Sequence, residues 1–199
     1  HHTPTLPLAI PSGLYRLEIY FTDPETKAKL PARTVVTGQS VGEIVPLTYI
    51  EVGSSPVAPT YALASQAEFG GQIRLLGGNL PAQSQATPGA PLRVTLVWRA
   101  LAQPATDYTG FVQVLDARGQ LVAQQDHPLT NNFLPSLWWQ PGFTVADEYQ
   151  IELPVDLEPG LYHLIVGIYD PATSVRLPLT IAGAAAGDAL QISELTIAN

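Results

Sequence analysis

The chain has 199 residues, of which 46% are hydrophobic and only 13% are charged, and it contains no cysteine. A net charge of −8 with nine scattered lysines and arginines excludes the phosphate-binding stripe of a nucleic-acid protein and disfavours docking on anionic lipid. Without cysteine there are no disulfides, thiolate nucleophiles or Cys-ligated zinc sites. No apolar run is long enough to span a bilayer, so we expect no membrane insertion by this segment.

The first residues of the chain indicate no function. There is no methionine, not even at position 1, so we expect a fragment or a processed or engineered form. We assign no role to the adjacent histidines at positions 1 and 2, because they are either natural or the remnant of a tag.

The first expected element is a strand that begins at Gly13 and ends before Asp23-Pro24. Its surroundings recur later in the chain. Residues 6–31 and 153–178 align without a gap at an offset of 147, and 11 of the 26 aligned positions are identical. The same offset places Val45 on Ile192 and Ile50 on Ile197. One register kept over this distance indicates an internal repeat.

Both copies of this strand alternate with a period of two residues. One face is apolar in each copy: Tyr162, Leu164, Val166 and Ile168 in the second, and Tyr15, Leu17, Ile19 and Phe21 in the first. We expect the second set to be buried in a core, and Arg16 and Glu18 on the opposite face to be exposed to water. Tyr162 follows a glycine turn, which predicts a tyrosine corner with its hydroxyl bonded to upstream backbone.

Residues 53–65 are small, polar and proline-containing, as in a linker. After them, strands are expected near residues 72–76, 92–98, 110–116, 120–126, 148–154, 160–169 and 190–197. Gly119 in the segment 117–119 predicts a hairpin turn, and Gly77-Gly78 predicts a bulge or a turn. No window shows a helical stripe. The pattern predicts an all-β protein, an antiparallel β-sandwich of Ig-like or jelly-roll type.

The domain organisation follows from the repeat. Residues 1–52 hold the C-terminal strands of a first β-sandwich copy, residues 53–65 form the linker, and residues 66–199 form a complete β-sandwich. The first copy lacks the strands that would cover its apolar face, and two or three such strands are not stable alone. Residues 3–52 must therefore be covered, either by the complete domain of the same chain or by pairing with strands of another polypeptide, identical or different. We favour the second.

The second copy resembles a β-sandwich domain found in the extracytoplasmic C-terminal region of bacterial membrane glycosyltransferases of the mannosyltransferase-like and aminoarabinose-transferase-like kind. The matching segments are "VTLVWRAL" (94–101), "DYTGFVQVLDARGQLVAQQD" (107–126), "LPSLWWQPG" (134–142), "DEYQIELP" (147–154) and "PGLYHLIVGIYDPATSVRLP" (159–178). The family often has a histidine where Gln113 stands here, so no role of that histidine carries over. The resemblance implies an accessory domain outside the membrane and brings no catalytic residues.

Trp138 and Trp139 are the candidate ligand-binding residues. Aromatic faces suit the apolar C–H side of a pyranose, so an exposed tryptophan would bind a glycan or another cell-envelope polymer. Neighbouring residues in an extended chain point in opposite directions, so we expect at least one of the two indoles to pack in the core.

No catalytic or metal site is expected. The acidic residues Asp147, Glu148, Glu152, Asp156 and Glu158 have neither a calcium-loop spacing nor the separation that a glycosidase pair needs, so we interpret them as solvated. The histidines lack metal-ligand spacing, and His127 precedes Pro128 in an expected turn. No serine lies in a nucleophile elbow. We expect no cofactor.

The sequence thus predicts a non-catalytic, extracytoplasmic module with a structural or accessory role in a cell-surface or membrane-anchored protein. Two alternatives stay open: a carbohydrate-binding module, which an exposed aromatic in a groove would favour, and a surface-assembly or filament subunit that shares strands between chains.

Overall fold

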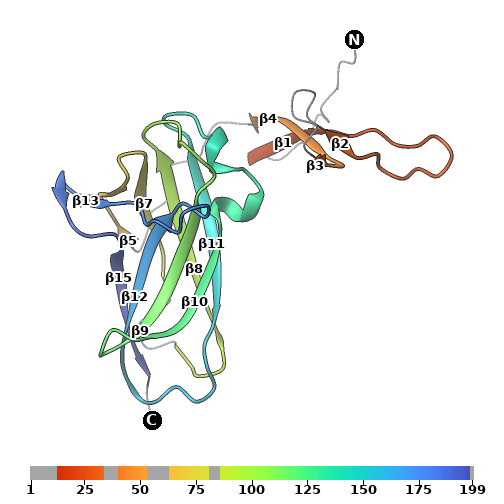
Figure 1. Cartoon of the computed structure of the whole chain (residues 1–199). Coiled ribbons are helices and arrows are strands. Elements are labelled where there is room, and N and C mark those ends of the chain that lie inside the picture. The colour runs from red at the N-terminus through yellow and green to blue at the C-terminus, as the bar shows by residue number, and fades with distance from the viewer. Residues whose placement is uncertain (1–12, 34–39, 53–62, 81–85, 198–199) are drawn as a thin grey trace. The chain divides into compact units, whose positions relative to one another are not determined.

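The computed structural model describes residues 13–33, 40–52, 63–80 and 86–197 (Figure 1). The chain divides into two compact units, His1–Pro59 and Thr60–Asn199. Nearly all regular structure is β, as predicted, and no described helix is of the length and hydropathy that a membrane span requires. The histidines at positions 1 and 2 and most of the expected linker, residues 53–62, lie outside the described residues.

The second unit is an antiparallel β-sandwich, which confirms the predicted fold class. One sheet has four strands in the order β10 (Leu121–Pro128), β9 (Thr109–Asp116), β12 (Gly160–Tyr169) and β15 (Leu190–Ile197). The long antiparallel strands run side by side in Figure 1. Strand β12 therefore lies inside its sheet, with β9 on one side and β15 on the other.

The second sheet has seven strands. Its order is β11 (Thr144–Glu152), β8 (Pro91–Ala100), β7 (Ile73–Asn79), β6 (Ala67–Phe69), β13 (Leu179–Ile181) and β14 (Ala184–Ala185), with β5 (Leu63–Ala64) also paired to β7. Leu63 and Ala64 pair with Gly78 and Gly77. These two residues, which their composition assigned to the linker, are thus part of the sandwich.

The core lies between the two sheets and follows the predicted alternation. Tyr162, Leu164, Val166 and Ile168 are all buried, as expected for the inward face of β12. The facing sheet contributes every second residue of β8 and β11, and these include Trp98, Tyr149 and Ile151. Two sheets that each present an apolar face are stable only when those faces pack together.

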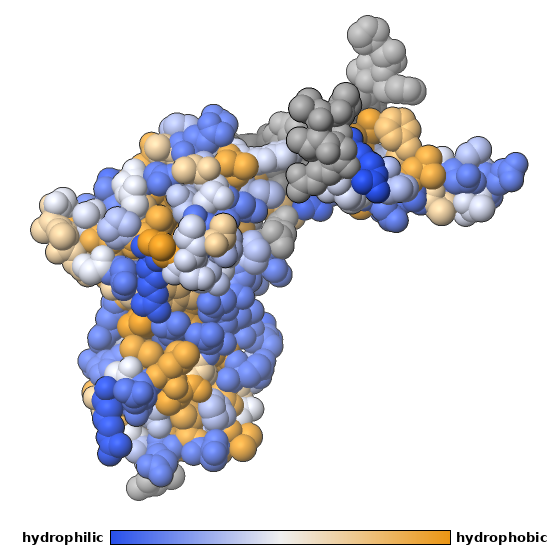
Figure 2. Space-filling view, in the orientation of Figure 1, coloured by the Kyte–Doolittle hydropathy of each residue, from blue (hydrophilic) through white to orange (hydrophobic). Residues whose placement is uncertain are grey.

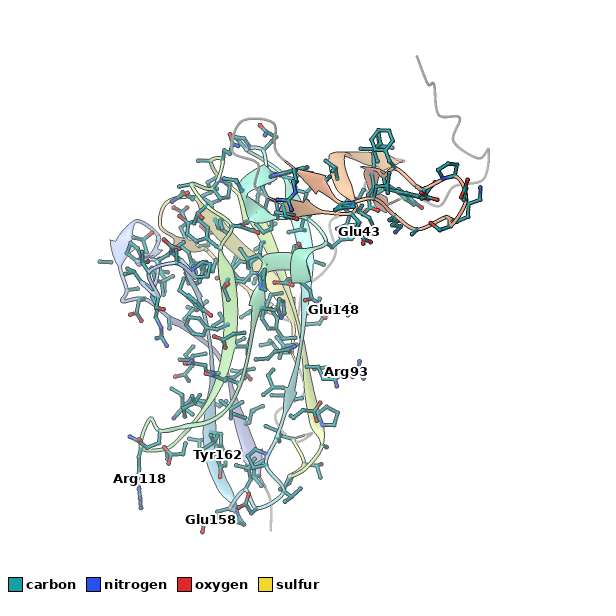
Figure 3. All side chains as sticks on the ribbon, turned by 45° about the vertical axis from the view of Figure 1, so that its right-hand side comes forward. Glu43, Arg93, Arg118, Glu148, Glu158 and Tyr162 are labelled. Atoms are coloured by element: carbon teal, nitrogen blue, oxygen red, sulfur yellow. The ribbon has the colours of Figure 1, made fainter. Side chains whose placement is uncertain are left out.

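The structure contains the tyrosine corner and the hairpin turn that the sequence predicts, and a bulge at Gly77. The Tyr162 hydroxyl donates to the carbonyl of Glu158 at 2.8 Å, which confirms the tyrosine corner near the end of the sandwich (Figure 3). The register of β7 against β8 shifts between Leu75 and Gly77, so of the two alternatives predicted at Gly77-Gly78 the structure has the bulge. Gly119 has φ +78° in the β9–β10 hairpin, a conformation that glycine adopts without steric cost.

The first unit contains two short pairs of strands. β1 (Gly13–Ile19) pairs antiparallel with β4 (Val45–Val52), and β2 (Ala32–Arg33) with β3 (Ser40–Gly42). Arg16 and Glu18 form an ion pair, and their side chains are 31% and 26% exposed, so the expectation that both face water holds only in part. The reason is that residues two apart on a strand share a face, and opposite charges there cover one another.

The repeat offset does not extend to the last strand. Tyr15 pairs with Ile50, whereas Tyr162 pairs with Leu195, so Ile50 takes the place of Leu195 in the ladder and not of Ile197. The connection between β1 and β4 is two residues longer than the one between β12 and β15. A shift of two residues keeps every side chain on its own face of the sheet, which makes this length change tolerable.

Candidate functional site

The candidate binding loop connects β10 to β11 and contains both predicted tryptophans. It includes two 3₁₀ turns, η1 (Leu129–Asn132) and η2 (Ser136–Trp138). Trp139 is fully buried, and its indole Nε1 donates to the carbonyl of Leu134 at 3.0 Å. An indole in the core with its N–H satisfied is a structural anchor. Trp139 is therefore not placed to stack on a ligand.

Trp138 is the tryptophan that reaches the surface. Its exposed fraction is 38%, and two large apolar neighbours in the same loop, Phe133 and Leu137, are exposed to 44% and 40%. We call these three residues the Trp138 patch. The backbone changes from the η2 turn to an extended conformation at Trp139 (φ −68°, ψ 128°), which turns one indole inward and leaves the other outward.

Hydrogen bonds fix the loop beneath the patch. Ser136 is fully buried, its Oγ accepts from the backbone N–H of Tyr108 at 2.8 Å, and its own N–H donates to Asp107 Oδ1 at 2.8 Å. On the exposed side, Gln103 Nε2 donates to the carbonyl of Leu137 at 3.1 Å. A loop held at several points loses little conformational entropy on binding.

The start of the loop stores backbone strain. Thr130 has φ +62°, which is unusual for a β-branched residue and costs about 1–3 kcal/mol. Its hydroxyl compensates within the loop, because it accepts from the N–H of Leu134 at 3.0 Å and lies 2.9 Å from the carbonyl of the same residue. Leu134 in turn accepts from the buried Trp139 indole. Strain of this kind persists only where surrounding contacts hold it.

A second polar cluster is buried between β10, an edge strand of the four-stranded sheet, and β11, an edge strand of the seven-stranded sheet. His127 Nε2 lies 2.9 Å from Asp147 Oδ1, and the Tyr149 hydroxyl donates to Asp147 Oδ2 at 2.9 Å. The rings of His127 and Tyr149 stack with centroids 4.2 Å apart. Burial raises the pKa of Tyr149 well above its usual range, and the neighbouring Asp147 raises it further.

This cluster corrects two expectations. Asp147 is not solvated but 2% exposed, and His127 lies in strand β10 rather than in a turn and is 9% exposed. The alternation of β11 contained the signal, because Asp147 is two residues before the inward-facing Tyr149. Glu148 and Arg93 point away from the sandwich in Figure 3. With His127 Nε2, both Asp147 carboxylate oxygens and the Tyr149 hydroxyl engaged inside the protein, the cluster is suited to joining the sheets rather than to receiving a substrate.

A third cluster lies on the outer face of the four-stranded sheet. The Arg176 guanidinium sits 4.4 Å from the centre of the Phe111 ring and bonds to Gln113 Oε1 at 3.3 Å and Asp188 Oδ1 at 3.4 Å. The ring of Phe111 covers Gly167, where an added Cβ would approach Phe111 Cζ to 2.2 Å. The Arg176 side chain thus covers the Phe111 ring, which projects from the outer face of the sheet.

Metal binding finds no support in the described part of the chain. Across residues 13–33, 40–52, 63–80 and 86–197, no three side chains of His, Asp or Glu come together in a group that could hold an ion. Glu152, Asp156 and Glu158 are exposed, as expected.

Comparisons with known proteins add a likeness of shape. No family profile and no curated protein sequence matches the chain. Among solved structures, the chain is similar to the crystal structure of the C-terminal domain of wzt. That similarity has 15% sequence identity and a TM-score of 0.46, and it covers 71% of this chain and 83% of that one. Function has to be argued from the site itself.

Proposed function

We propose that this chain is a non-catalytic β-sandwich module that contacts glycan outside the cell membrane, with the Trp138 patch as the contact surface. The observation that carries the proposal is the pairing of a buried anchor with an exposed aromatic. Trp139 is fully buried and Trp138 is 38% exposed, on a loop that side-chain hydrogen bonds hold in place. This is how a protein presents an aromatic face at low entropic cost.

The chemistry of the patch favours a sugar ring. The apolar side of a pyranose packs on an aromatic face, and its hydroxyls need polar partners around the edge. Gln103 and Gln140 are exposed side chains next to the patch, the first through its bond to the carbonyl of Leu137 and the second as the residue after Trp139. Neither is charged, which suits a neutral sugar better than a phosphate or a carboxylate.

The proposed absence of catalysis rests on the polar clusters. His127, Asp147 and Tyr149 bond to one another inside the protein, and Arg176 is engaged with Gln113, Asp188 and the Phe111 ring. An enzyme of this size would need at least one reactive group facing a cleft. The location outside the membrane rests on the resemblance of residues 94–178 to the glycosyltransferase-associated domain.

The test is retention of the purified chain on gels containing a panel of neutral polysaccharides. We expect slowed migration in at least one of them, loss of retention in Trp138→Ala and partial recovery in Trp138→Phe, which keeps an aromatic face. Val175→Ala is the matched control, because Val175 is also apolar and exposed but lies outside the loop. Thermal melts of each variant separate loss of binding from loss of folding.

Two results would contradict the proposal. The first is that no polysaccharide in the panel slows the unmodified chain. The second is that Trp138→Ala is retained as strongly as Val175→Ala, which would assign binding to another surface. Either result would favour the hypothesis that the module has a purely structural role.

A further inference from the structure

The two units share a turn of the same geometry. Asp23 and Asp170 each begin it and accept at Oδ1 from the N–H two residues later, at 2.9 Å from Glu25 and 2.8 Å from Ala172. The fifth residue of each turn has positive φ, +60° at Lys27 and +58° at Ser174. Each of these residues also donates its N–H back to the carbonyl of the initial aspartate, at 2.9 and 2.8 Å.

The strands on either side of the turn match as well. In β1 against β4 the register shifts between Leu17 and Glu18, and in β12 against β15 it shifts between Leu164 and Ile165. These are equivalent positions in the repeat. A bulge at the same place in both ladders bends both strands in the same way. Strand β1 with its turn therefore has the local structure of β12.

The two strands differ in what covers them. Val166 and Ile168 are 0% exposed because β12 pairs with β9 and faces the second sheet, whereas the equivalent residues Ile19 and Phe21 are 39% and 68% exposed. Figure 2 shows hydrophobic residues at the surface of the first unit next to the hydrophilic turn. Within the described residues, β1 pairs with β4 alone. The position that β9 occupies beside β12 has no counterpart there.

The aromatic ring that lies under the cation comes from a different strand position in each unit. In the second unit Arg176 lies over the ring of Phe111, which comes from β9 and covers Gly167 of β12. In the first unit the residue equivalent to Gly167 is Tyr20, and Lys29, equivalent to Arg176, lies 4.8 Å from the Tyr20 ring centre. The cation is kept, but its aromatic partner now comes from the β1 segment itself.

We propose that the edge of β1 binds an added antiparallel strand with the pattern of β9, supplied by another polypeptide, and that this strand has a small residue opposite Tyr20. Apolar residues of the added strand would face Leu17 and Ile19, as Val114 and Val112 face Leu164 and Val166. A large residue opposite Tyr20 would collide with its ring, just as a side chain at position 167 would collide with Phe111. Backbone pairing provides the affinity, and the small residue provides the selectivity.

The test uses the full chain and two fluorescent peptides with the sequence of residues 107–118. One peptide is unchanged and the other carries Phe111→Ala. We expect the Phe111→Ala peptide to bind saturably and at least tenfold more tightly than the unchanged peptide, as measured by fluorescence anisotropy. Hydrogen exchange on the same complexes is expected to slow at the amides of residues 17–22, which assigns the binding to β1.

Two protein variants control for the assignment. Ile19→Asp and Phe21→Asp place a charge on the proposed face at side chains that are already partly exposed, so at least one is expected to fold. We expect each folded variant to bind the Phe111→Ala peptide at least tenfold more weakly. Glu25→Gln in the exposed turn is the matched control and leaves binding unchanged.

Three outcomes would overturn the proposal. In the first, neither peptide binds. In the second, the unchanged peptide binds as well as the Phe111→Ala peptide, so that Tyr20 does not select. In the third, the amides of residues 17–22 that do not pair with β4 or within the turn are already protected without peptide, which would mean that another part of the chain or a second copy covers this edge of β1. The polysaccharide assay does not depend on any of these results.

Discussion

His127 and Asp147 join the two sheets of the sandwich through a contact of 2.9 Å between Nε2 and Oδ1. They belong to β10 and β11, which are edge strands of different sheets. Apolar side chains pack against one another in many ways, whereas a buried hydrogen bond requires one alignment. The contact therefore specifies how these edges meet as well as stabilising them.

Replacing Asp147 by alanine is expected to lower the free energy of unfolding by about 3 kcal/mol. The change leaves the buried Tyr149 hydroxyl and His127 ring without their shared partner. Glu148→Ala, which alters the next residue on the exposed face of β11, is the control and is expected to change stability by less than about 0.5 kcal/mol. Urea denaturation measures both, and similar values for the two variants would refute a structural role of the cluster.

Tyr149 makes stability depend on pH in the alkaline range. Burial raises the pKa of Tyr149 above its ordinary value of 10.0, so the folded state keeps a proton that the unfolded state loses. The stabilisation is fully present below pH 10 and decreases above it, with a slope of about 1.4 kcal/mol per pH unit for one proton. Tyr149→Phe removes the buried hydroxyl that donates to Asp147, so we expect a lower free energy of unfolding at neutral pH. The variant is also expected to lose the decrease in stability above pH 10 that ionisation of residue 149 causes. Denaturation curves between pH 8 and 11 test this, and equal slopes would contradict it.

Leu164 and Ile19 occupy matched faces with different surroundings. Leu164 is fully buried and Ile19 is 39% exposed. Leu164→Ala is expected to cost about 2–5 kcal/mol because it leaves a cavity between the sheets. Ile19→Ala is expected to cost less than about 1 kcal/mol. Thermal and urea unfolding of the two variants provide the comparison, and a large loss in Ile19→Ala would show that the first unit has a core of its own.

Gly167 is required by the ring that lies across it. Gly167→Ala places a Cβ at 2.2 Å from Phe111 Cζ and 3.0 Å from the carbonyl oxygen of Asp188. Overpacking of this kind costs about 1–3 kcal/mol. The double variant with Phe111→Leu is expected to recover part of the loss, because the ring is the closest obstacle. Additive losses in a double-mutant cycle would mean that the Asp188 backbone, and not Phe111, sets the limit.

Strand positions were predictable where the alternation of side chains was regular. The inward faces of β8, β11 and β12, the β9–β10 hairpin and the Gly77 bulge all follow from spacing and turn residues. The short strands β5, β6, β13 and β14 were not predicted, because two or three residues carry no measurable period. β5 and β6 pair with the longer β7, β13 pairs with β6, and β14 pairs with β13. The pairing of β13 with β6 joins segments that are far apart in the chain, and no local pattern indicates it.

The candidate site was predictable only in part. The doublet at 138 and 139 predicts that one indole is buried, but the choice of Trp139 depends on the η2 turn and on the carbonyl of Leu134. The burial of Asp147 was not predicted, because charged side chains are rarely buried. Its position in the alternation of β11 nevertheless places it on the inward face. Its partner His127 comes from another strand, and local sequence contains no information about which strand that is. Contacts across a sandwich become visible only in three dimensions.

The pairing of Phe69 in β6 with Leu179 in β13 has a consequence for how the protein is made. The first strands of the seven-stranded sheet leave the ribosome long before the strand that completes it. The four-stranded sheet that packs on β7 and β8 is completed later still, by β15. Such long-range pairing slows folding and prolongs the exposure of intermediates. Synthesis rate and chaperone supply, rather than oxidation in this cysteine-free chain, would therefore govern the yield of folded protein.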